Sequence, residues 1–404
     1  MLIFNILRKK QIGGRIYKRD MIDKKQNGQF FTKNSDYILS SFSSFIENKE
    51  IIDPFAGDGD LIKWAIKNHA KKIIGFDIDK RYIDNKKVFL NDSIINPGKY
   101  IFLLTNPPYL HKNKANEKTK EKYFSGKNAI FEDLYQVSIS SVLDCEEGII
   151  IVPLNFLCAE NSQRIRNLFF NKFEIIKLNI FSEQVFEDTT YNVISFYFKK
   201  KKNFLELNKI PATIFPEKKD ISLTLEKRFN WQFGGEFINR IKNTKNYLGI
   251  FRLTEDYLES GEYKVELAFQ NIKEKSLLPV SKNFKKLMEK NILFLRAIDS
   301  KNGKKIQLED IRDYGISGLV GKDTSRNMAH LIFKKELPIE EQIELMKTFN
   351  KELNQERNKY FSFFLTNFRD NNRKRISFDL TYKFLNYIYL NKNSYNKEQR
   401  LLFS

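Results

Sequence analysis

The stretch IIDPFAGDGD, residues 51–60, joins a short apolar run to the start of an amphipathic helical pattern. Glycines at positions 57 and 59 allow a sharp strand-to-helix turn and a close approach of the backbone to a ligand. Three acidic residues in the turn, Asp53, Asp58 and Asp60, would repel a phosphate group. The turn therefore favours a ligand with a cationic end, such as the ammonium of S-adenosylmethionine. A plain nucleotide-binding turn is the alternative.

Apolar runs and helical patterns continue to alternate up to about residue 200. Strands are predicted at 51–53, 73–79, 100–105, 148–153, 175–180 and 191–198, and helices at 131–143 and 160–173. Residues 80–90 predict a further helix that ends in a short strand. This alternation favours an α/β fold with a mostly parallel, Rossmann-like sheet that has helices on both faces. Ligands of such sheets bind beyond the carboxyl ends of the strands.

Composition narrows the class of protein. The 404 residues include 70 Lys and Arg against 50 Asp and Glu, and the net charge of +20 favours a polyanionic partner such as nucleic acid. An AT-rich genome would also produce a chain rich in lysine, so charge alone does not decide this. Two cysteines indicate no disulfide framework, and three scattered histidines indicate no metal site. No apolar stretch is long enough for a signal peptide or a membrane span, which predicts a soluble cytoplasmic protein.

The motif Asn106-Pro107-Pro108-Tyr109 directly follows the predicted buried strand at 100–105. An exocyclic amino nitrogen is a poor nucleophile because its lone pair is delocalised into the ring. The Asn106 side-chain oxygen and the Pro107 carbonyl can accept its two hydrogens, and the rigid Pro-Pro step fixes where both acceptors point. Tyr109 can stack on a planar substrate, which is worth about 1–3 kcal/mol. The motif therefore predicts methylation of a planar amino or amide nitrogen.

Two further carboxylates follow predicted strands. Asp77, in GFDID (75–79), can accept hydrogen bonds from the ribose hydroxyls of an adenosyl group. Asp92, in NDS (91–93), can accept from an adenine amino group. Either residue alone could be an ordinary solvated strand end. Their spacing from the glycine turn favours an adenosyl ligand.

In this order the motifs resemble those of the N6-adenine-specific DNA methyltransferases of restriction-modification systems, in their gamma arrangement. In that arrangement the cofactor motifs precede the catalytic motif and the target-recognition domain is C-terminal. The segments GQFFT (28–32), DLY (133–135) and GIIIVPLNF (148–156) also match elements of this family. The resemblance covers about residues 28–200. It implies a seven-stranded methyltransferase sheet, S-adenosyl-L-methionine as the methyl donor, and an adenine flipped out of duplex DNA.

The resemblance also implies roles for individual residues. The catalytic residues would be Asn106, Pro107, Pro108 and Tyr109. The cofactor pocket would be lined by Phe30, Thr32, Asp53, Phe55, Ala56, Gly57, Asp77, Ile78, Asp92 and Ser93. Tyr109 would stack on one face of the target base. An aromatic of residues 194–198 would cover the other face, where Phe198 fits best by spacing and Phe196 shares its side of the strand.

We expect an N-terminal extension (1–27), a catalytic domain (28–204) and a C-terminal α+β target-recognition domain (205–404). Beyond residue 205 the alternation of strands and helices is lost, and one long helical pattern runs from about 338 to 364. Two basic stretches, 322–326 and 369–375, are candidates for DNA contact, although a solvated loop explains each equally well. Their candidate residues are Lys322, Arg326, Arg369, Arg373, Lys374 and Arg375.

The kind of substrate depends on the large basic C-terminal region. The same four-residue motif occurs in enzymes that methylate glutamine in proteins, but such enzymes lack a C-terminal region of this size. An RNA adenine methyltransferase and a non-catalytic DNA-binding subunit of the same fold remain alternatives. Neither cysteine lies in the Pro-Cys turn that cytosine carbon-5 methylation needs. We expect duplex DNA as the partner and a monomer as the oligomeric state. Any restriction endonuclease of the system is expected to be a separate protein.

Overall fold

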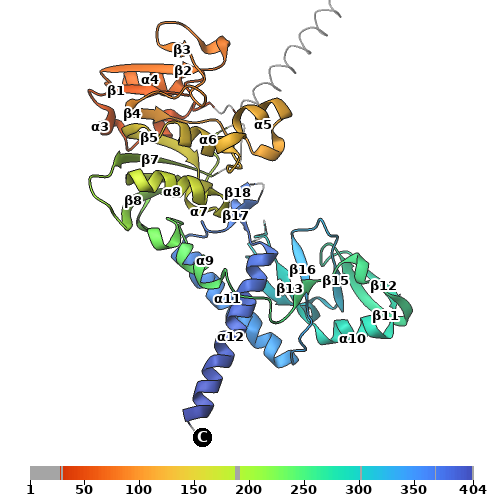
Figure 1. Ribbon diagram of the computed structural model, residues 1–404. Coiled ribbons are helices and arrows are strands. Elements are labelled where there is room, and N and C mark those ends of the chain that lie inside the picture. The colour runs from red at the N-terminus through yellow and green to blue at the C-terminus, as the bar shows by residue number, and fades with distance from the viewer. Residues whose placement is uncertain (1–27, 29–30, 187–191, 301–302, 369, 403–404) are drawn as a thin grey trace, which may run out of the picture. The chain divides into compact units, whose positions relative to one another are not determined.

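The structure is a computed structural model that describes residues 28, 31–186, 192–300, 303–368 and 370–402. It divides into two compact units, Met1–Phe233 and Gly234–Ser404 (Figure 1). Within the described ranges, every helix is too short or too polar to cross a membrane. Residues 1–27, Phe30 and Arg369, for which the sequence gives predictions, lie outside the described residues.

A sheet of nine strands forms the centre of the described part of the first unit, in the order β3-β2-β1-β4-β5-β7-β6-β8-β9 (Figure 1). The strands are β1 (Glu50–Asp53), β2 (Lys72–Asp77), β3 (Val88–Leu90), β4 (Tyr100–Thr105), β5 (Cys145–Pro153), β6 (Phe173–Phe181), β7 (Val193–Lys200), β8 (Leu207–Phe215) and β9 (Lys219–Glu226). The α-helices are α2 (Ser35–Ile38), α3 (Ser43–Ile46), α4 (Asp60–Lys67), α5 (Glu117–Tyr123), α6 (Leu134–Ser141), α7 (Asn155–Cys158) and α8 (Gln163–Lys172).

The direction of the strands confirms the Rossmann-like α/β fold. Strands β3, β2, β1, β4 and β5 are parallel, and β7 runs antiparallel between β5 and β6. From β1 the chain first builds the sheet outward through β2 and β3, and it then returns to the other side of β1 with β4. Strands β1 and β4 therefore flank the topological switch point, where such sheets bind ligands.

The sheet has nine strands, not the expected seven, because the chain returns to it after β7. Strand β8 pairs in parallel with β6, with Leu178 opposite Ala212, and β9 pairs antiparallel with β8. Residues 207–226, expected in the C-terminal domain, thus complete the sheet of the first unit. The expected boundary at 204/205 falls between two strands of one sheet, and the second unit begins at Gly234.

Alternate side chains of β7 enter both faces of the sheet, as the pleat requires. Phe196 and Phe198 are fully buried against Phe169 of α8, with ring centroids 5.6 and 5.2 Å away. Tyr197 points to the opposite face and stacks on Phe45 of α3 at 4.0 Å. Helices therefore cover both faces, as the sequence predicts.

The second unit is a mixture of small sheets and helices, as expected for an α+β domain. Its strands are β10 (Ile250–Arg252), β11 (Ser260–Phe269), β12 (Lys275–Val280), β13 (Leu293–Arg296), β14 (Gln307–Asp310), β15 (Gly318–Val320), β16 (Met328–Phe333), β17 (Thr366–Phe368) and β18 (Asp370–Arg375). They pair in the orders β10-β16-β13-β14, β12-β11-β15 and β17-β18. Its helices are α9 (Gly235–Ile241), α10 (Lys282–Lys290), α11 (Ile339–Lys359) and α12 (Phe378–Leu402). Helix α11 is the long helix predicted from the sequence.

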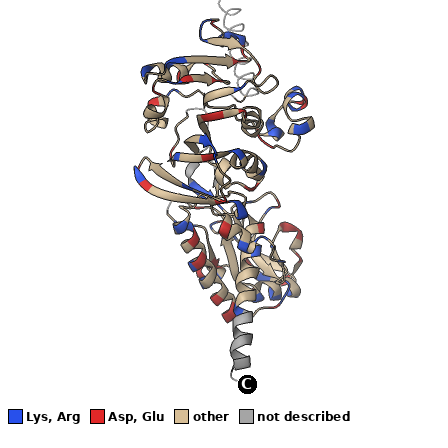
Figure 2. Ribbon diagram, turned by 60° about the vertical axis from the view of Figure 1, so that its left-hand side comes forward, with Lys and Arg blue, Asp and Glu red and all other residues tan. Residues whose placement is uncertain are grey.

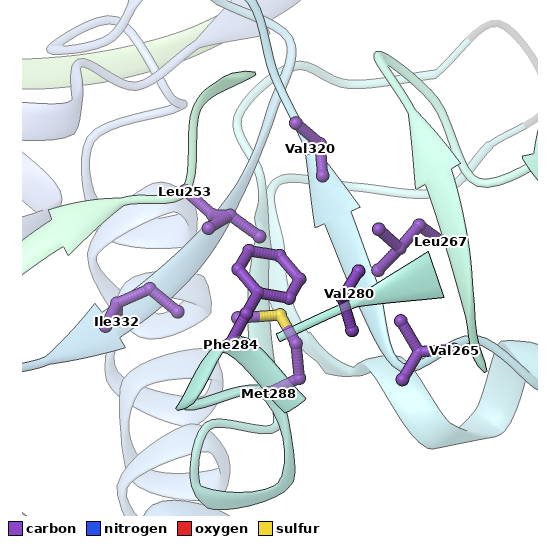
Figure 3. Close-up of a cluster of buried hydrophobic side chains, with 8 residues drawn as sticks. All are labelled: Leu253, Val265, Leu267, Val280, Phe284, Met288, Val320 and Ile332. Carbon is purple, nitrogen blue, oxygen red and sulfur yellow. The ribbon is translucent and has the colours of Figure 1, made fainter. Parts of the chain in front are cut away.

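An apolar cluster packs α10 against the sheet that contains β11 and β12 (Figure 3). Phe284 and Met288 lie one helical turn apart, so both point from the same face of α10. At Gly318 a Cβ atom would lie 2.6 Å from the Met288 sulfur, so glycine lets β15 approach the helix. The cluster consists of Leu253, Val265, Leu267, Val280, Phe284, Met288, Val320 and Ile332.

Gly148→Ala tests the close contact between β4 and β5. A Cβ atom at Gly148 would lie 2.4 Å from the Leu103 carbonyl oxygen and 2.7 Å from the Leu103 Cβ. Because backbone in a central strand cannot shift freely, we expect a loss of about 3 kcal/mol in the stability of the first unit. Thermal unfolding followed by circular dichroism measures it. Gly321→Ala, where the nearest atom would be 3.7 Å away, is the control and should melt like the wild type.

Candidate functional site

A pocket lies at the carboxyl ends of β1, β2 and β4, at the switch point of the sheet. The expected cofactor residues Thr32, Asp53, Phe55, Ala56, Gly57, Asp77, Ile78, Asp92 and Ser93 all line it. Of the expected catalytic residues, Asn106 and Pro108 line it, whereas Pro107 and Tyr109 do not. The structure therefore brings the cofactor motifs and the Asn-Pro-Pro-Tyr motif to one place.

Asp53 is the most deeply buried carboxylate of this pocket. Its Oδ1 accepts hydrogen bonds from the Phe55 backbone N–H (3.1 Å) and from the Thr105 hydroxyl (2.8 Å). Its Oδ2 is buried and has no hydrogen-bond partner among the described residues. Burial, with a smaller contribution from the charge of Asp77, raises the pKa of Asp53 to about 7. A buried oxygen left without a donor is costly, and such groups mark ligand sites.

Asp77 fixes the glycine turn onto the end of β2. Its Oδ2 accepts from the Gly57 N–H at 2.8 Å and its Oδ1 from the Asp79 N–H at 2.7 Å. Burial raises the pKa of this carboxyl as well. Gly75 lets the strand pass directly beneath the turn, since a Cβ there would lie 2.6 Å from that of Ala56.

Asp92 is held by two residues of α5 that the sequence analysis missed. Its Oδ2 accepts from the Tyr123 hydroxyl at 2.9 Å and lies 2.7 Å from the Lys122 ammonium. Tyr123 also lines the pocket, and burial raises its pKa to about 12. The segment EKTKEKY (117–123) has the composition of a solvated surface helix, so nothing in its pattern indicated this role.

The Asn106 amide is oriented by bonds to two other expected site residues. Its Nδ2 donates to the Thr32 hydroxyl at 3.1 Å, and its Oδ1 accepts from the Tyr109 hydroxyl at 2.5 Å. The Tyr109 N–H donates to the Gly28 carbonyl at 2.8 Å. Gly28 has φ +63° and lies so close that a Cβ would be 2.7 Å from the Tyr109 carbonyl oxygen. The GQFFT segment therefore packs directly on the catalytic turn.

The DLY segment (133–135) supports the same turn from the other side. The Asp133 carboxylate accepts from the Leu110 N–H at 3.2 Å, and the Leu134 N–H donates to the Leu110 carbonyl at 2.9 Å. Asp133 also caps α6 in a reciprocal pair with Gln136. Burial raises the pKa of Asp133 to about 6. The turn that carries Asn106 is thus clamped to the start of a helix.

The prediction of Phe196 and Phe198 as base-stacking aromatics is wrong. Both rings are fully buried in the packing against α8 and cannot reach the pocket. Two other aromatic residues contact Tyr109 edge-on: Tyr135 of α6, with ring centroids 6.3 Å apart, and Phe186, after β6, at 6.4 Å. The sequence predicts the strand at 191–198. It does not show which face of that strand packs against a helix, and this decides where Phe196 and Phe198 lie.

The candidate DNA-binding residues of the second unit differ in their surroundings. Lys322 and Arg326 are exposed, and Arg373 and Arg375 are half-buried. Lys374 is buried with its ammonium over the Phe363 ring, which removes it from the candidate surface. Basic residues occur in both units (Figure 2). There are 38 Lys and Arg against 28 Asp and Glu in residues 1–233, and 32 against 22 in residues 234–404.

The chain is similar in sequence to known methyltransferases. Residues 12–186 match the model of the family described as Eco57I restriction-modification methylase. The ribosomal RNA small subunit methyltransferase A of Mycoplasmopsis synoviae (strain 53) is 32% identical over 101 residues, which cover 25% of this chain and 36% of that protein.

Two solved structures of low sequence identity are also similar. The type IIL restriction-modification enzyme MmeI, in complex with DNA, has a TM-score of 0.50 at 11% identity and covers 94% of this chain and 67% of that chain. A type I restriction-modification system methyltransferase subunit from Streptococcus thermophilus has a TM-score of 0.32 at 14% identity, covering 46% of this chain and 47% of that one.

The match to the curated relative spans only 36% of that protein's length, and the structural likeness to MmeI concerns the fold alone. The family match is stronger evidence than either of these, because residues 12–186 include the glycine turn, the Asn-Pro-Pro-Tyr motif and the DLY segment. Residues 12–186 thus resemble the Eco57I restriction-modification methylases, which supports the prediction of a restriction-modification DNA methyltransferase.

Proposed function

We propose that this chain transfers a methyl group from S-adenosyl-L-methionine to the N6 amino group of an adenine flipped out of duplex DNA, as the modification enzyme of a restriction-modification system. One observation carries the proposal. A buried carboxylate with an unpartnered oxygen, Asp53, and a hydrogen-bonded amide acceptor, Asn106, line the same pocket in the described chain. The first suits a cationic ligand and the second suits an amino group.

The residues of the pocket fit S-adenosylmethionine. Asp53 Oδ2 would accept from its ammonium, which would satisfy the buried oxygen. Asp77 would accept from the ribose hydroxyls, and Asp92 from the adenine amino group. When bound, the cofactor supplies an electrophilic methyl group on its sulfonium sulfur. The pocket's acidic lining, which includes Asp58 and Asp60, suits this positive charge.

Asn106 would act on the amino group that receives the methyl. Thr32 holds the Nδ2 side of the amide, so the Oδ1 side is the one that can accept an amino hydrogen. The Pro107 carbonyl would accept the second hydrogen. Two acceptors on one amino group draw its nitrogen toward a tetrahedral geometry and make its lone pair available.

Tyr109 would stack on the target base, which requires a change from the arrangement in the structure. Its hydroxyl bonds to Asn106 Oδ1, and the ring is 4% exposed with edge contacts to Tyr135 and Phe186. The incoming amino group would replace the hydroxyl at Asn106. Phe186, near Tyr109, would take the role of second aromatic.

A second candidate is methylation of adenine in RNA. The relative at 32% identity is by its name a ribosomal RNA methyltransferase, which supports this reading over 101 residues. The match to a restriction-modification methylase family covers a longer segment, residues 12–186, and favours DNA. Methyl transfer to duplex DNA and to transcribed RNA of the same sequence distinguishes the two.

Asn106→Ala should keep cofactor binding and lose methyl transfer by about 10²–10³-fold, because one of the two amino-group acceptors is removed. Calorimetry with S-adenosylmethionine measures the first quantity, and methylation-aware sequencing of co-expressed plasmid DNA measures the second. Undiminished methyl transfer in this variant would contradict the proposed mechanism. A wild-type chain that binds no S-adenosylmethionine would instead support the non-catalytic alternative.

Tyr109→Phe and Tyr109→Ala separate the hydroxyl from the ring. Phenylalanine keeps the stacking face and releases Asn106 Oδ1, so methyl transfer should stay within about threefold of the wild type. Alanine removes stacking worth about 1–3 kcal/mol and should lower transfer by about tenfold or more. Equal losses in both variants would mean that the hydroxyl, not the ring, serves the reaction.

Asp53→Asn should raise the stability of the first unit at pH 8 while weakening S-adenosylmethionine binding. The pKa of Asp53 in the folded chain, about 7, lies above its ordinary value, so its ionised form destabilises the fold. The neutral variant is therefore expected to gain about 4 kcal/mol at pH 8, and the gain should vanish as pH falls from 7 to 4.

Thermal melts between pH 8 and pH 4 measure the gain in stability of the Asp53→Asn variant over the wild type. Asp58→Asn is the control, because it removes an exposed carboxylate from the same pocket and should melt like the wild type at every pH. A variant at position 53 that binds the cofactor as tightly as the wild type would contradict the ammonium assignment.

A further inference from the structure

The two basic stretches singled out in the sequence, 322–326 and 369–375, meet in the second unit. The segment after β13 lies between them. The Ala297 N–H donates to the Asn327 carbonyl at 2.8 Å, and the Ile376 N–H donates to the Ala297 carbonyl at 3.0 Å. Ile298 forms an antiparallel bridge with Arg375. Because adjacent strands lie about 4.8 Å apart, the backbones at Arg326 and Arg375 are about 10 Å apart. Two arginine side chains can span that distance.

Both arginines lack an acidic partner in the part of the chain that the structure describes. Arg326 is exposed, and Arg375 is half-buried. The Nε of Arg375 is buried and has no hydrogen-bond partner among the described residues. Burial and then the charge of Arg326 lower the pKa of Arg375. Like charges held together in this way are stabilised by an anion, and a buried N–H without an acceptor indicates a missing one.

The loop that carries Arg326 is held in place by a different arginine. The Arg252 guanidinium donates to the Ser325 carbonyl at 2.8 Å and to the Asp323 carbonyl at 2.5 Å. These bonds fix the backbone of the loop without using the Arg326 side chain.

The strand that carries Arg375 is anchored by the buried carboxylate of Asp299. Arg357 pairs with both oxygens of that carboxylate at 2.9 and 2.8 Å, and the Lys374 N–H donates to it at 3.2 Å. The Asp299 carboxylate thus joins α11 to the strand that carries Arg375. Because strand side chains alternate, burial of Lys374 sends Arg375 to the opposite side. The backbone of both segments is thus held in place by bonds in which neither arginine side chain takes part.

We infer that Arg326 and Arg375 together bind one backbone phosphate of the DNA, an inference that rests on the proposed function. The planar guanidinium group presents parallel N–H donors that match two phosphate oxygens, and Arg375 Nε would find its acceptor there. Phosphate contacts position a duplex without reading its sequence. This site would therefore place the second unit on the duplex, and base contacts would come from other residues.

Duplex binding measured by fluorescence anisotropy over a series of salt concentrations tests the site. Arg326→Gln and Arg375→Gln should each weaken binding about tenfold. The double variant should lose less than the product of the two single losses, because both side chains contact one phosphate. The slope of log K against log salt should fall by about one in the double variant.

Matched variants keep the result interpretable. Lys286→Gln removes one exposed charge from α10 and should leave affinity and slope near the wild type. Arg375→Lys keeps the positive charge but loses the parallel N–H donors of the guanidinium. This variant should keep the slope of log K against log salt and bind duplex DNA more weakly. It also serves if the glutamine variants fail to fold, which a thermal melt would reveal. Titration with S-adenosylmethionine should be unchanged in every variant.

Other outcomes overturn the inference in distinguishable ways. If the wild type binds duplex DNA and the arginine variants behave like Lys286→Gln, the phosphate site is wrong while the proposed function stands. If the wild type binds S-adenosylmethionine but prefers RNA of the same sequence to duplex DNA, both proposals for DNA fall. If inorganic phosphate binds in an arginine-dependent manner while duplex affinity is unchanged in the variants, the site is one for small anions.

Discussion

One hydrogen bond across the switch point joins the two halves of the pocket. The Thr105 hydroxyl donates to Asp53 Oδ1, and Thr105 is the residue directly before Asn106. Asp53 is fully buried, so its carboxylate depends on the few donors within reach, and without the Thr105 hydroxyl its Oδ1 would keep only the Phe55 N–H. The position of Asn106 is therefore tied to the position of the glycine turn. Strands β1 and β4 can make this bond because they are parallel neighbours in the sheet, with Ile52 opposite Leu103.

The acceptor atom of Asn106 is occupied in the structure in a way that allows its release. The Tyr109 hydroxyl has one hydrogen and lies within reach of two acceptors, Asn106 Oδ1 at 2.5 Å and the Ile151 carbonyl at 3.0 Å. A small rotation of the hydrogen toward Ile151 keeps the hydroxyl hydrogen-bonded and leaves Oδ1 able to accept from another donor. An amino group can then take the place of the hydroxyl at little cost. Together with the bond to Thr32, the bond from the Tyr109 hydroxyl orients the amide.

Features that depend on neighbouring residues could be predicted from the sequence, and features that depend on packing could not. Glycine turns and carboxylates at strand ends are local, which is why Asp53 and Asp77 fall in the pocket as expected. Of the helix with a short terminal strand expected at 80–90, the strand is present as β3, but only Lys80–Tyr82 is helical, as a 3₁₀ turn. After it, Asp84 Oδ1 accepts from three successive backbone N–H groups and forms a turn in place of the helix. Tyr123 reaches the pocket only through the placement of α5. Phe198 is buried because α8 covers its face of the sheet.

The same distinction explains why net charge is a poor guide to the nucleic-acid surface. Both units carry a similar excess of basic residues, and several arginines of the second unit are neutralised inside it, as Arg357 is by Asp299. Lys374 and Arg375 are neighbours with equal charge. The Lys374 ammonium lies over the Phe363 ring, whereas the Arg375 guanidinium lies near Arg326. What marks a site for a polyanion is positive charge that the fold holds in place and leaves unpaired. Sequence composition counts all such charges alike, and only the pairing pattern of the folded chain separates them.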